Sequence, residues 1–120
     1  MIYGIGVDII EIGRVKNAIE KTTGFLSKVF NESEIRYSKK RYESLAGNFA
    51  AKEAFAKALG TGIRGFSLKE VEVVRDELGK PSIVLHGNVK ELIDNKNIII
   101  HLSISHNKDN AVAYVVLERI

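Results

Sequence analysis

The sequence predicts an α+β fold in which helices pack on a small antiparallel sheet. Segments rich in β-branched residues occur at the start of the chain and in its last third, whereas segments with helical periodicity lie mainly between them. The resulting order is strand, helices, hairpin, helix and hairpin, which is typical of α+β proteins. The chain has 120 residues, the usual size of one domain, and shows no internal repeat or linker. We therefore expect residues 1–120 to form a single domain.

The N-terminal half is predicted to contain one strand followed by helices. Ile12, Val15 and Ile19 recur at i, i+3 and i+7, which is the spacing of an amphipathic helix. Gly60 follows a long helical pattern and is expected to cap that helix. The expected elements are a strand over 2–10, helices over 12–22, 25–30 and 41–59, and a further helix that begins near Asn31.

The C-terminal half is predicted to contain two hairpins separated by a short helix. Apolar residues alternate with charged ones from Leu68 onward, and Asp76–Gly79 has the composition of a turn. A second turn is expected around Asn107–Asn110. The expected elements are strands over 68–75 and 81–86, a helix over 87–95, and strands over 98–105 and 111–118.

The composition narrows the classes of location and partner. The absence of cysteine excludes internal disulfides and is typical of a cytoplasmic protein. No signal peptide is visible, and the longest apolar run, residues 111–117, is too short to span a bilayer, so we expect no membrane association. The 18 basic and 15 acidic residues give a net charge of +3, which favours anionic partners without making nucleic-acid binding the default.

Asp8 is a carboxylate inside an otherwise apolar predicted strand. A buried charge without a partner is costly, so the position indicates a ligand, a cation or a pairing residue. Gly6, two residues earlier, would allow a ligand to approach the backbone closely. The alternative is that Asp8 caps the following helix or pairs with a lysine.

The long predicted helix carries a second group of charged candidates. Ala46, Ala50, Glu53 and Lys57 share one stripe, in which the alanines leave room for a ligand beside the two charged side chains. The alternative is an ordinary Glu–Lys pair on a solvated face. Lys52 falls within the apolar stripe, where it either contacts a ligand or extends its ammonium to water.

A basic run, Lys39–Arg41, stands where the long helix is expected to begin. Cations oppose the helix dipole there, and a bound phosphate would reverse that unfavourable charge. The alternative is a solvated basic loop.

Polar residues on one face of the predicted strand over 98–105 form a further candidate group. His101, Ser103 and Ser105 alternate with isoleucine and leucine, and His106 stands at the strand end, where contact with a ligand is easy. A plain polar face of a sheet is the alternative. Ser105 and His106 are adjacent and point to opposite faces, which disfavours a Ser-His-Asp hydrolase.

Known nucleotide and zinc motifs are absent, so any metal site depends on carboxylates. No Walker loop, dinucleotide fingerprint or Cys/His pattern is present. If Asp8 and Glu53 bind a metal together, their oxygen ligands favour Mg²⁺ bound to a phosphate ester.

Five motifs in order along the chain resemble the holo-[acyl-carrier-protein] synthase family, the small bacterial type of 4′-phosphopantetheinyl transferase. They are Gly4-Ile-Gly-Val-Asp8, the segment Leu45–Ala58 with Lys52-Glu53-Ala54, Gly60-Thr-Gly62, Gly79-Lys80-Pro81 and Ser103-Ile-Ser-His106. The resemblance covers essentially the whole chain. It implies an α+β fold like half of the larger transferases, and a homotrimer with active sites between subunits.

The resemblance also implies the reaction. The enzyme would move 4′-phosphopantetheine from coenzyme A to a serine of apo acyl carrier protein, release adenosine 3′,5′-bisphosphate and serve fatty acid biosynthesis. Within the family the aspartate and glutamate that match Asp8 and Glu53 bind Mg²⁺. Glu53, directly or through a metal-bound water, is the hypothesis for the general base, and Lys57 for a catalytic phosphate contact.

Further contacts follow from the resemblance and from spacing. Arg14 matches the family position that grips an acidic carrier helix, and Lys21 shares its helical stripe. Asn48 stands where many relatives carry arginine, so a phosphate contact there would be lost or weakened. With this resemblance, His106 and Lys40 are candidates for contact with the 3′-phosphate of coenzyme A, and the loop Gly79-Lys80-Pro81 resembles the family's pantetheine-side loop. The remaining candidate coenzyme A contacts are Lys52 and Ser105.

Two other classes of protein remain possible from the residues alone. A basic nucleic-acid-binding module would explain the charge but not the carboxylates at Asp8 and Glu53, which repel phosphates unless a metal intervenes. A different metal-dependent phosphotransferase or nuclease would share those carboxylates, and coenzyme A binding distinguishes it.

Overall fold

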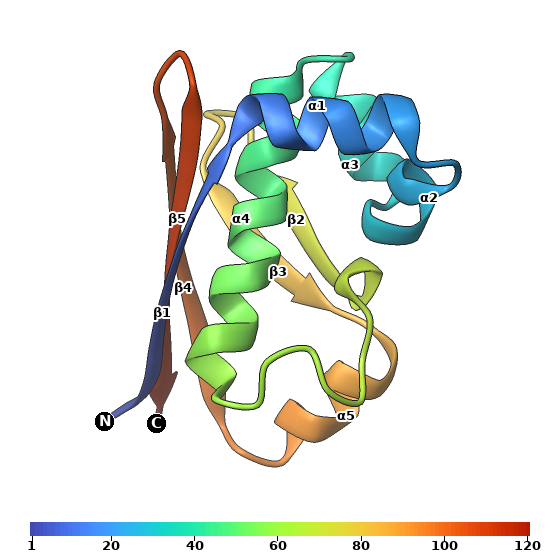
Figure 1. The fold of residues 1–120 in the computed structure, drawn as a ribbon. Coiled ribbons are helices and arrows are strands. Elements are labelled where there is room, and N and C mark those ends of the chain that lie inside the picture. Colours follow the sequence, from blue (N-terminus) through green and yellow to red (C-terminus); the bar gives the residue numbers. More distant parts are fainter.

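The structure, a computed structural model, describes all residues from Met1 to Ile120. A long helix, α4 (Tyr42–Leu59), lies between a three-stranded antiparallel sheet and a two-stranded hairpin (Figure 1). The three-stranded sheet has the order β1 (Ile2–Glu11), β5 (Asn110–Arg119) and β4 (Ile98–His106), and the hairpin pairs β2 (Val71–Arg75) with β3 (Pro81–Leu85). The remaining elements are α1 (Ile12–Lys21), α2 (Phe25–Val29), α3 (Glu32–Ser38), the 3₁₀ turn η1 (Leu68–Glu70) and α5 (Gly87–Asp94).

Two glycines of β1 bring its backbone into direct contact with α4. A Cβ atom on Gly4 would lie 2.0 Å from the Ala58 carbonyl oxygen, and one on Gly6 would lie 2.0 Å from the Ala54 carbonyl oxygen. No side chain fits at such distances, so only glycine permits this packing. The interpretation of Gly6 as an approach for a ligand is therefore wrong, because α4 occupies that space.

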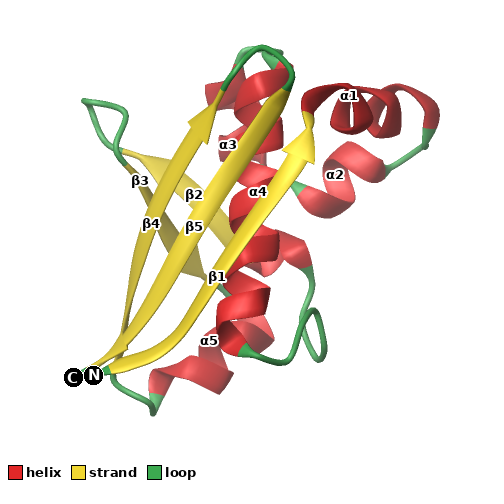
Figure 2. Ribbon diagram, turned by 60° about the vertical axis from the view of Figure 1, so that its left-hand side comes forward, coloured by secondary structure: helices red, strands yellow, loops and turns green.

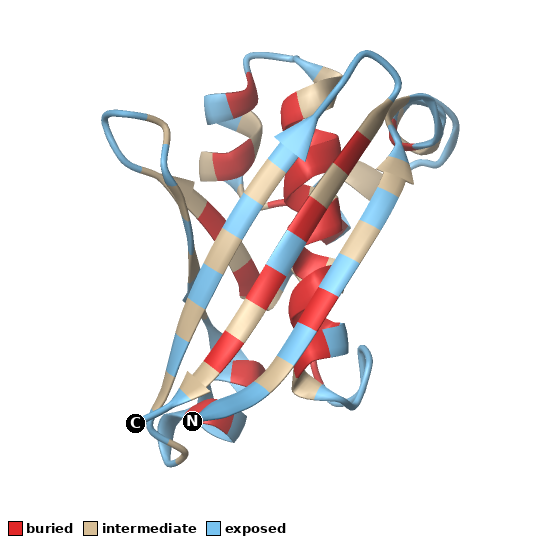
Figure 3. Cartoon of the chain, turned by 90° about the vertical axis from the view of Figure 1, so that its left-hand side faces the viewer, coloured by how far each residue is buried: buried red, intermediate tan, exposed pale blue.

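The three-stranded sheet is covered on one face only. Its inner face supplies buried residues such as Val115 and Leu117, which pack against α4. Figure 3 shows the sheet from its other side, which no helix covers. On that outer face Ile5, Val7 and Ile9 of β1 are 57%, 50% and 67% exposed.

Helices α1, α2 and α3 gather at the end of the molecule where α4 begins, while both chain termini lie at the opposite end (Figure 2). Buried residues there, among them Val15, Phe30 and Leu45, form an apolar cluster separate from the one between α4 and the sheet. Asn31 and Glu34 form a reciprocal capping box at the start of α3. The helix predicted to begin near Asn31 is therefore confirmed.

The predicted order of elements is confirmed, and the main difference lies at residues 68–70. These residues form a 3₁₀ turn instead of the first part of a strand, because Ser67 and Glu70 cap each other. The strand therefore begins only at Val71. Gly60 caps α4 with a positive φ of 89°, as predicted. None of the helices has the length and apolarity needed to cross a membrane.

Candidate active site

The seam between β1 and α4 brings three of the predicted site residues together. Alternation along β1 points Asp8 toward α4, and its side chain is 17% exposed. Lys57 donates a hydrogen bond of 3.1 Å to Asp8 Oδ1 and one of 3.0 Å to the Val7 carbonyl oxygen. Glu53 lies one turn before Lys57 on the same helix. Residues separated by about 50 positions in the sequence thus share one small site.

The charges in this seam are not balanced. Burial raises the pKa of the Glu53 carboxyl, the nearby Asp8 carboxylate raises it further, and the Lys57 ammonium partly lowers it. Two carboxylates that repel each other beside a single ammonium form a site that a cation would stabilise.

The donor set fits Mg²⁺. Asp8 and Glu53 offer only oxygen ligands, and Mg²⁺ commonly binds to one or two carboxylates together with substrate phosphates and waters. No group of three or more histidine, aspartate or glutamate side chains is arranged to hold a metal ion, so the protein would supply two ligands here and leave the others to substrate and solvent.

A second candidate region lies at the N-terminal end of α4, where a cavity of about 350 Å³ opens. It contains three predicted residues, Gly79, Pro81 and His106, which come from the β2–β3 turn, the start of β3 and the end of β4. The complete lining is Tyr37, Arg41, Glu43, Ser44, Arg75, Gly79, Pro81, Ile104 and His106. Two guanidinium groups and an imidazole face a single carboxylate, so the cavity suits an anion.

Three other predicted residues do not line this cavity. Lys40 directly precedes Arg41, and of the basic run Lys39–Arg41 only the arginine lines the cavity. Lys80 is exposed, and its backbone N–H donates to Asp76 Oδ1 at 2.9 Å. Ser105 is exposed on the outer face of the sheet. Their roles remain predictions.

Lys52 occupies the interior of the protein. Its ammonium is fully buried and donates to Glu34 Oε1 at 2.9 Å, to the Leu68 carbonyl at 3.0 Å and to the Val71 carbonyl at 2.5 Å. Burial lowers the pKa of Lys52, and the neighbouring Glu34 carboxylate opposes this shift. An ammonium has three donors, and all are used. This corrects the interpretation of Lys52 as a coenzyme A contact, and it also excludes extension of the side chain to water.

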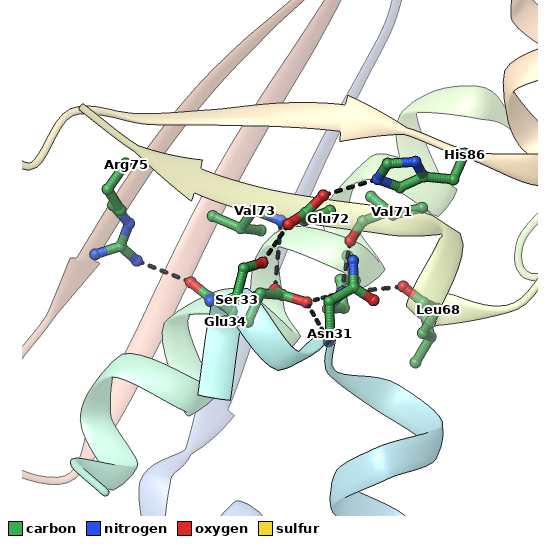
Figure 4. Close-up of polar contacts among 11 residues, drawn as sticks. Asn31, Ser33, Glu34, Leu68, Val71, Glu72, Val73, Arg75 and His86 are labelled. Carbon is green, nitrogen blue, oxygen red and sulfur yellow. Dashed lines mark hydrogen bonds and ion pairs between the residues drawn. The ribbon is translucent and has the colours of Figure 1, made fainter. Parts of the chain in front are cut away.

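Figure 4 shows the network around Glu34, which joins α3 to β2 and α4. Glu34 Oε2 accepts from Asn48 Nδ2 at 3.2 Å, and Asn48 Oδ1 accepts from Arg75 at 2.8 Å. Asn48 is therefore buried between a carboxylate and a guanidinium, and one of these partners, Arg75, lines the anion cavity.

The sequence analysis did not identify Tyr37, Ser44 and Arg75 as lining residues of this cavity. Arg75 ends a strand just before a turn, and Tyr37 lies in the last turn of α3. Neither position has a sequence signal of its own, because only the tertiary fold brings these elements together.

The residues predicted to contact a carrier protein lie on α1. Arg14 and Lys21 are both exposed, and Lys21 is in the last turn of the helix. They are accessible to a partner, and their role remains a prediction.

Comparison with known proteins supports one family. A sequence profile of the 4′-phosphopantetheinyl transferase superfamily matches residues 4–115. A holo-[acyl-carrier-protein] synthase from Clostridium perfringens (strain SM101 / Type A) is 57% identical, with 98% of this chain and 95% of that protein covered. The synthase from Clostridium tetani (strain Massachusetts / E88) is 55% identical, with coverage of 98% and 97%.

Solved structures of the same family share the fold. The synthase from Neisseria meningitidis matches with a TM-score of 0.88 at 36% identity, covering 99% of this chain and all of that one. The Bacillus anthracis synthase in complex with CoA (3′,5′-ADP) matches with a TM-score of 0.83 at 41% identity, covering 100% and 99% of the two chains. The chain therefore belongs to the 4′-phosphopantetheinyl transferase superfamily and, within it, to the holo-[acyl-carrier-protein] synthases. The predicted family and fold class are confirmed.

Proposed function

We propose that this protein transfers 4′-phosphopantetheine from coenzyme A to a serine of apo acyl carrier protein, with Mg²⁺ held by Asp8 and Glu53. The transfer itself is the activity of the family to which the chain belongs, and it serves fatty acid biosynthesis. The observation that carries the assignment of the reacting centre is the seam of Asp8, Glu53 and Lys57. The proposal keeps the cytoplasmic location that the sequence predicts.

The residues of the seam can do most of the chemistry by position and charge. Attack of the serine hydroxyl on the pyrophosphate builds negative charge on the phosphate oxygens, and Lys57 offers an ammonium that is still 56% exposed. Bound Mg²⁺ would neutralise phosphate charge and orient the diphosphate. Glu53 has a raised pKa, which moves it toward the range that suits a general base for the serine proton.

The anion cavity is the proposed site for the nucleotide end of coenzyme A. His106 and Arg41 provide donors there, and the turn at Gly79 and Pro81 forms one wall. Lys40 and Lys80 flank this lining in the sequence and are proposed to contact phosphate groups from the rim. The diphosphate of coenzyme A would then extend from the cavity toward Asp8 along α4, with the pantetheine arm beyond it.

We also propose a homotrimer with active sites between subunits. The uncovered outer face of the sheet supports it, because contiguous exposed apolar residues usually mark an interface. Ile9, Val112 and Ser105 are aligned across β1, β5 and β4 by strand register. Asp8 is next to Ile9 in β1, so a second subunit packed on this outer face would lie close to Asp8, Glu53 and Lys57. Ser105 would then lie in the interface between the two subunits.

The carrier protein is proposed to bind along α1. Arg14 and Lys21 expose positive charge there, and a net charge of +3 suits an acidic partner. Neither a nucleic acid nor a membrane is part of the proposal.

The proposal is tested by incubating the protein with coenzyme A, Mg²⁺ and several apo carrier proteins, and weighing each carrier by mass spectrometry. We expect a carrier to gain one phosphopantetheine in the presence of Mg²⁺. No gain with any carrier would contradict the transfer, whereas equal gain after chelation would contradict the metal.

A further inference from the structure

Two residues that line the cavity at the N-terminal end of α4 carry the two buried side-chain polar atoms that lack a hydrogen-bond partner in this structure. They are Ser44 Oγ and Arg75 Nε. Buried polar atoms are normally paired, and each exception requires an explanation. Ser44 is 9% exposed and belongs to the first turn of α4, whereas Arg75 ends β2. Their coincidence in one cavity indicates a ligand that accepts hydrogen bonds.

Arg75 is held in place by two contacts. One terminal nitrogen donates to Asn48 Oδ1 at 2.8 Å, and the guanidinium carbon lies 5.4 Å from the centre of the Tyr37 ring. Asn48 is itself fixed, because it is 2% exposed and donates to the buried Glu34. In Figure 4 the Arg75 side chain lies at the other end of β2 from His86, and a dashed line marks its hydrogen bond to Asn48 of α4. An arginine fixed at one edge keeps its remaining donors in a defined direction.

The charges around the cavity favour an anion. Arg41 is oriented by its Nε, which donates to the Ser38 carbonyl at 3.0 Å. His106, at the end of β4, also lines the cavity. Glu43 is the one carboxylate in the lining. The N-terminus of α4 adds its partial positive charge, and no side chain caps it.

We propose that Arg75, positioned by Asn48, is a specificity-determining residue that binds the 3′-phosphate of coenzyme A. A phosphate monoester has three acceptor oxygens, which suits a cavity lined by an arginine whose Nε and a serine whose hydroxyl lack a hydrogen-bond partner. The function of Asn48 is then to orient an arginine that reaches the phosphate from β2. This inference rests on the proposed function, because it takes coenzyme A as the substrate.

The test compares coenzyme A with its 3′-dephospho form as substrates for the wild-type protein and for Arg75→Met. For the wild type we expect kcat/KM to favour coenzyme A. In Arg75→Met that preference should fall about tenfold or more, the size expected for a lost charge-assisted hydrogen bond. Arg75→Lys should restore part of the preference, since it keeps the charge.

Two further variants distinguish the orientation of Arg75 by Asn48 from the general effect of losing one positive charge. Asn48→Ala should reduce the preference by a smaller factor than Arg75→Met, because the arginine remains but loses its orientation. Arg36→Met removes the same charge from the exposed face of α3 and serves as the matched control, with a preference like that of the wild type. Thermal unfolding shows that each variant is folded before its kinetics are compared.

The outcomes are distinct. A wild-type protein that transfers nothing from coenzyme A contradicts the proposed function. A wild type that transfers but does not distinguish the two substrates overturns the role of Arg75 alone. An Arg75→Met protein that keeps the wild-type preference for coenzyme A also overturns the role of Arg75. This holds even if kcat/KM falls, provided that it falls equally for both substrates.

Discussion

Lys57 Nζ lies 3.1 Å from Oδ1 of Asp8, and this ion pair joins α4 to β1. The same two side chains act on Glu53, whose pKa is raised by burial and by Asp8 and partly lowered by Lys57. The second hydrogen bond of Lys57, to the Val7 carbonyl, fixes the ammonium against the strand. Lys57 therefore partly offsets the effect of burial and of the Asp8 carboxylate on the pKa of Glu53.

Replacing Lys57 by methionine should lower kcat by about 10²–10³-fold, because a positioned charge that stabilises the transition state is lost. Lys57 lowers the pKa of Glu53, so its removal raises that pKa further. If deprotonated Glu53 is the base, the acidic limb of the pH–rate profile moves to higher pH.

The measurement is kcat/KM against pH for Lys57→Met and for Lys90→Met, an exposed lysine of α5 that serves as control. A Lys57→Met profile whose acidic limb stays in place or moves to lower pH would contradict the role of Lys57.

Replacing Lys52 by methionine should destabilise the protein by about 3–5 kcal/mol, because the Glu34 carboxylate is left buried without its partner. Urea denaturation measures this loss. The double variant Glu34→Gln with Lys52→Met should recover part of it, since no charge is then buried. If Lys52→Met instead kept its stability and lost only coenzyme A affinity, Lys52 would belong in the binding site after all.

Gly6→Ala should prevent the close contact of β1 with α4 and separate Asp8 from Glu53. The added methyl group would meet the Ala54 carbonyl at 2.0 Å, a distance that only a shift of the backbone can relieve. We expect loss of soluble folded protein or loss of transfer activity. Gly13→Ala is the control, because a Cβ there has no neighbour within 4 Å and alanine favours the helix by about 0.5–1 kcal/mol. A fully active Gly6→Ala protein would refute this packing.

Ile9→Glu should convert the proposed trimer to monomers, because it places a charge on the uncovered apolar face at one of its most exposed residues. Light scattering coupled to size-exclusion chromatography gives the mass of the assembly. Val84→Glu, at an exposed position of β3, should leave that mass unchanged. A wild-type protein that is monomeric at micromolar concentration would rule out the trimer.

The seam could be predicted from the sequence because its signals are local. Asp8 is conspicuous within an apolar strand, and Glu53 and Lys57 share a helix face by spacing alone. The environment of Lys52 could not be predicted, since the face that it shares with apolar residues is compatible with solvent or with a buried partner. Its partner, Glu34, appeared only as part of a helix start.

The residues that line the anion cavity likewise include some that the sequence predicts and some that it does not. His106 and the Gly79–Pro81 turn carry recognisable sequence patterns, whereas Arg75 and Ser44 reach the cavity only because β2 and the first turn of α4 meet in the fold. The close contact made by Gly6 was likewise invisible, since a glycine in a strand can serve a ligand or a helix equally well.

The most direct test of the central claim is the mass of an apo acyl carrier protein after incubation with coenzyme A and Mg²⁺ and either the wild type, Asp8→Asn or Glu53→Gln. Both substitutions keep the shape of the side chain and remove its charge. We predict one added phosphopantetheine with the wild type, and none with either variant or after chelation over the same time. Full modification of the carrier by both folded variants would show that Asp8 and Glu53 do not form the reacting centre.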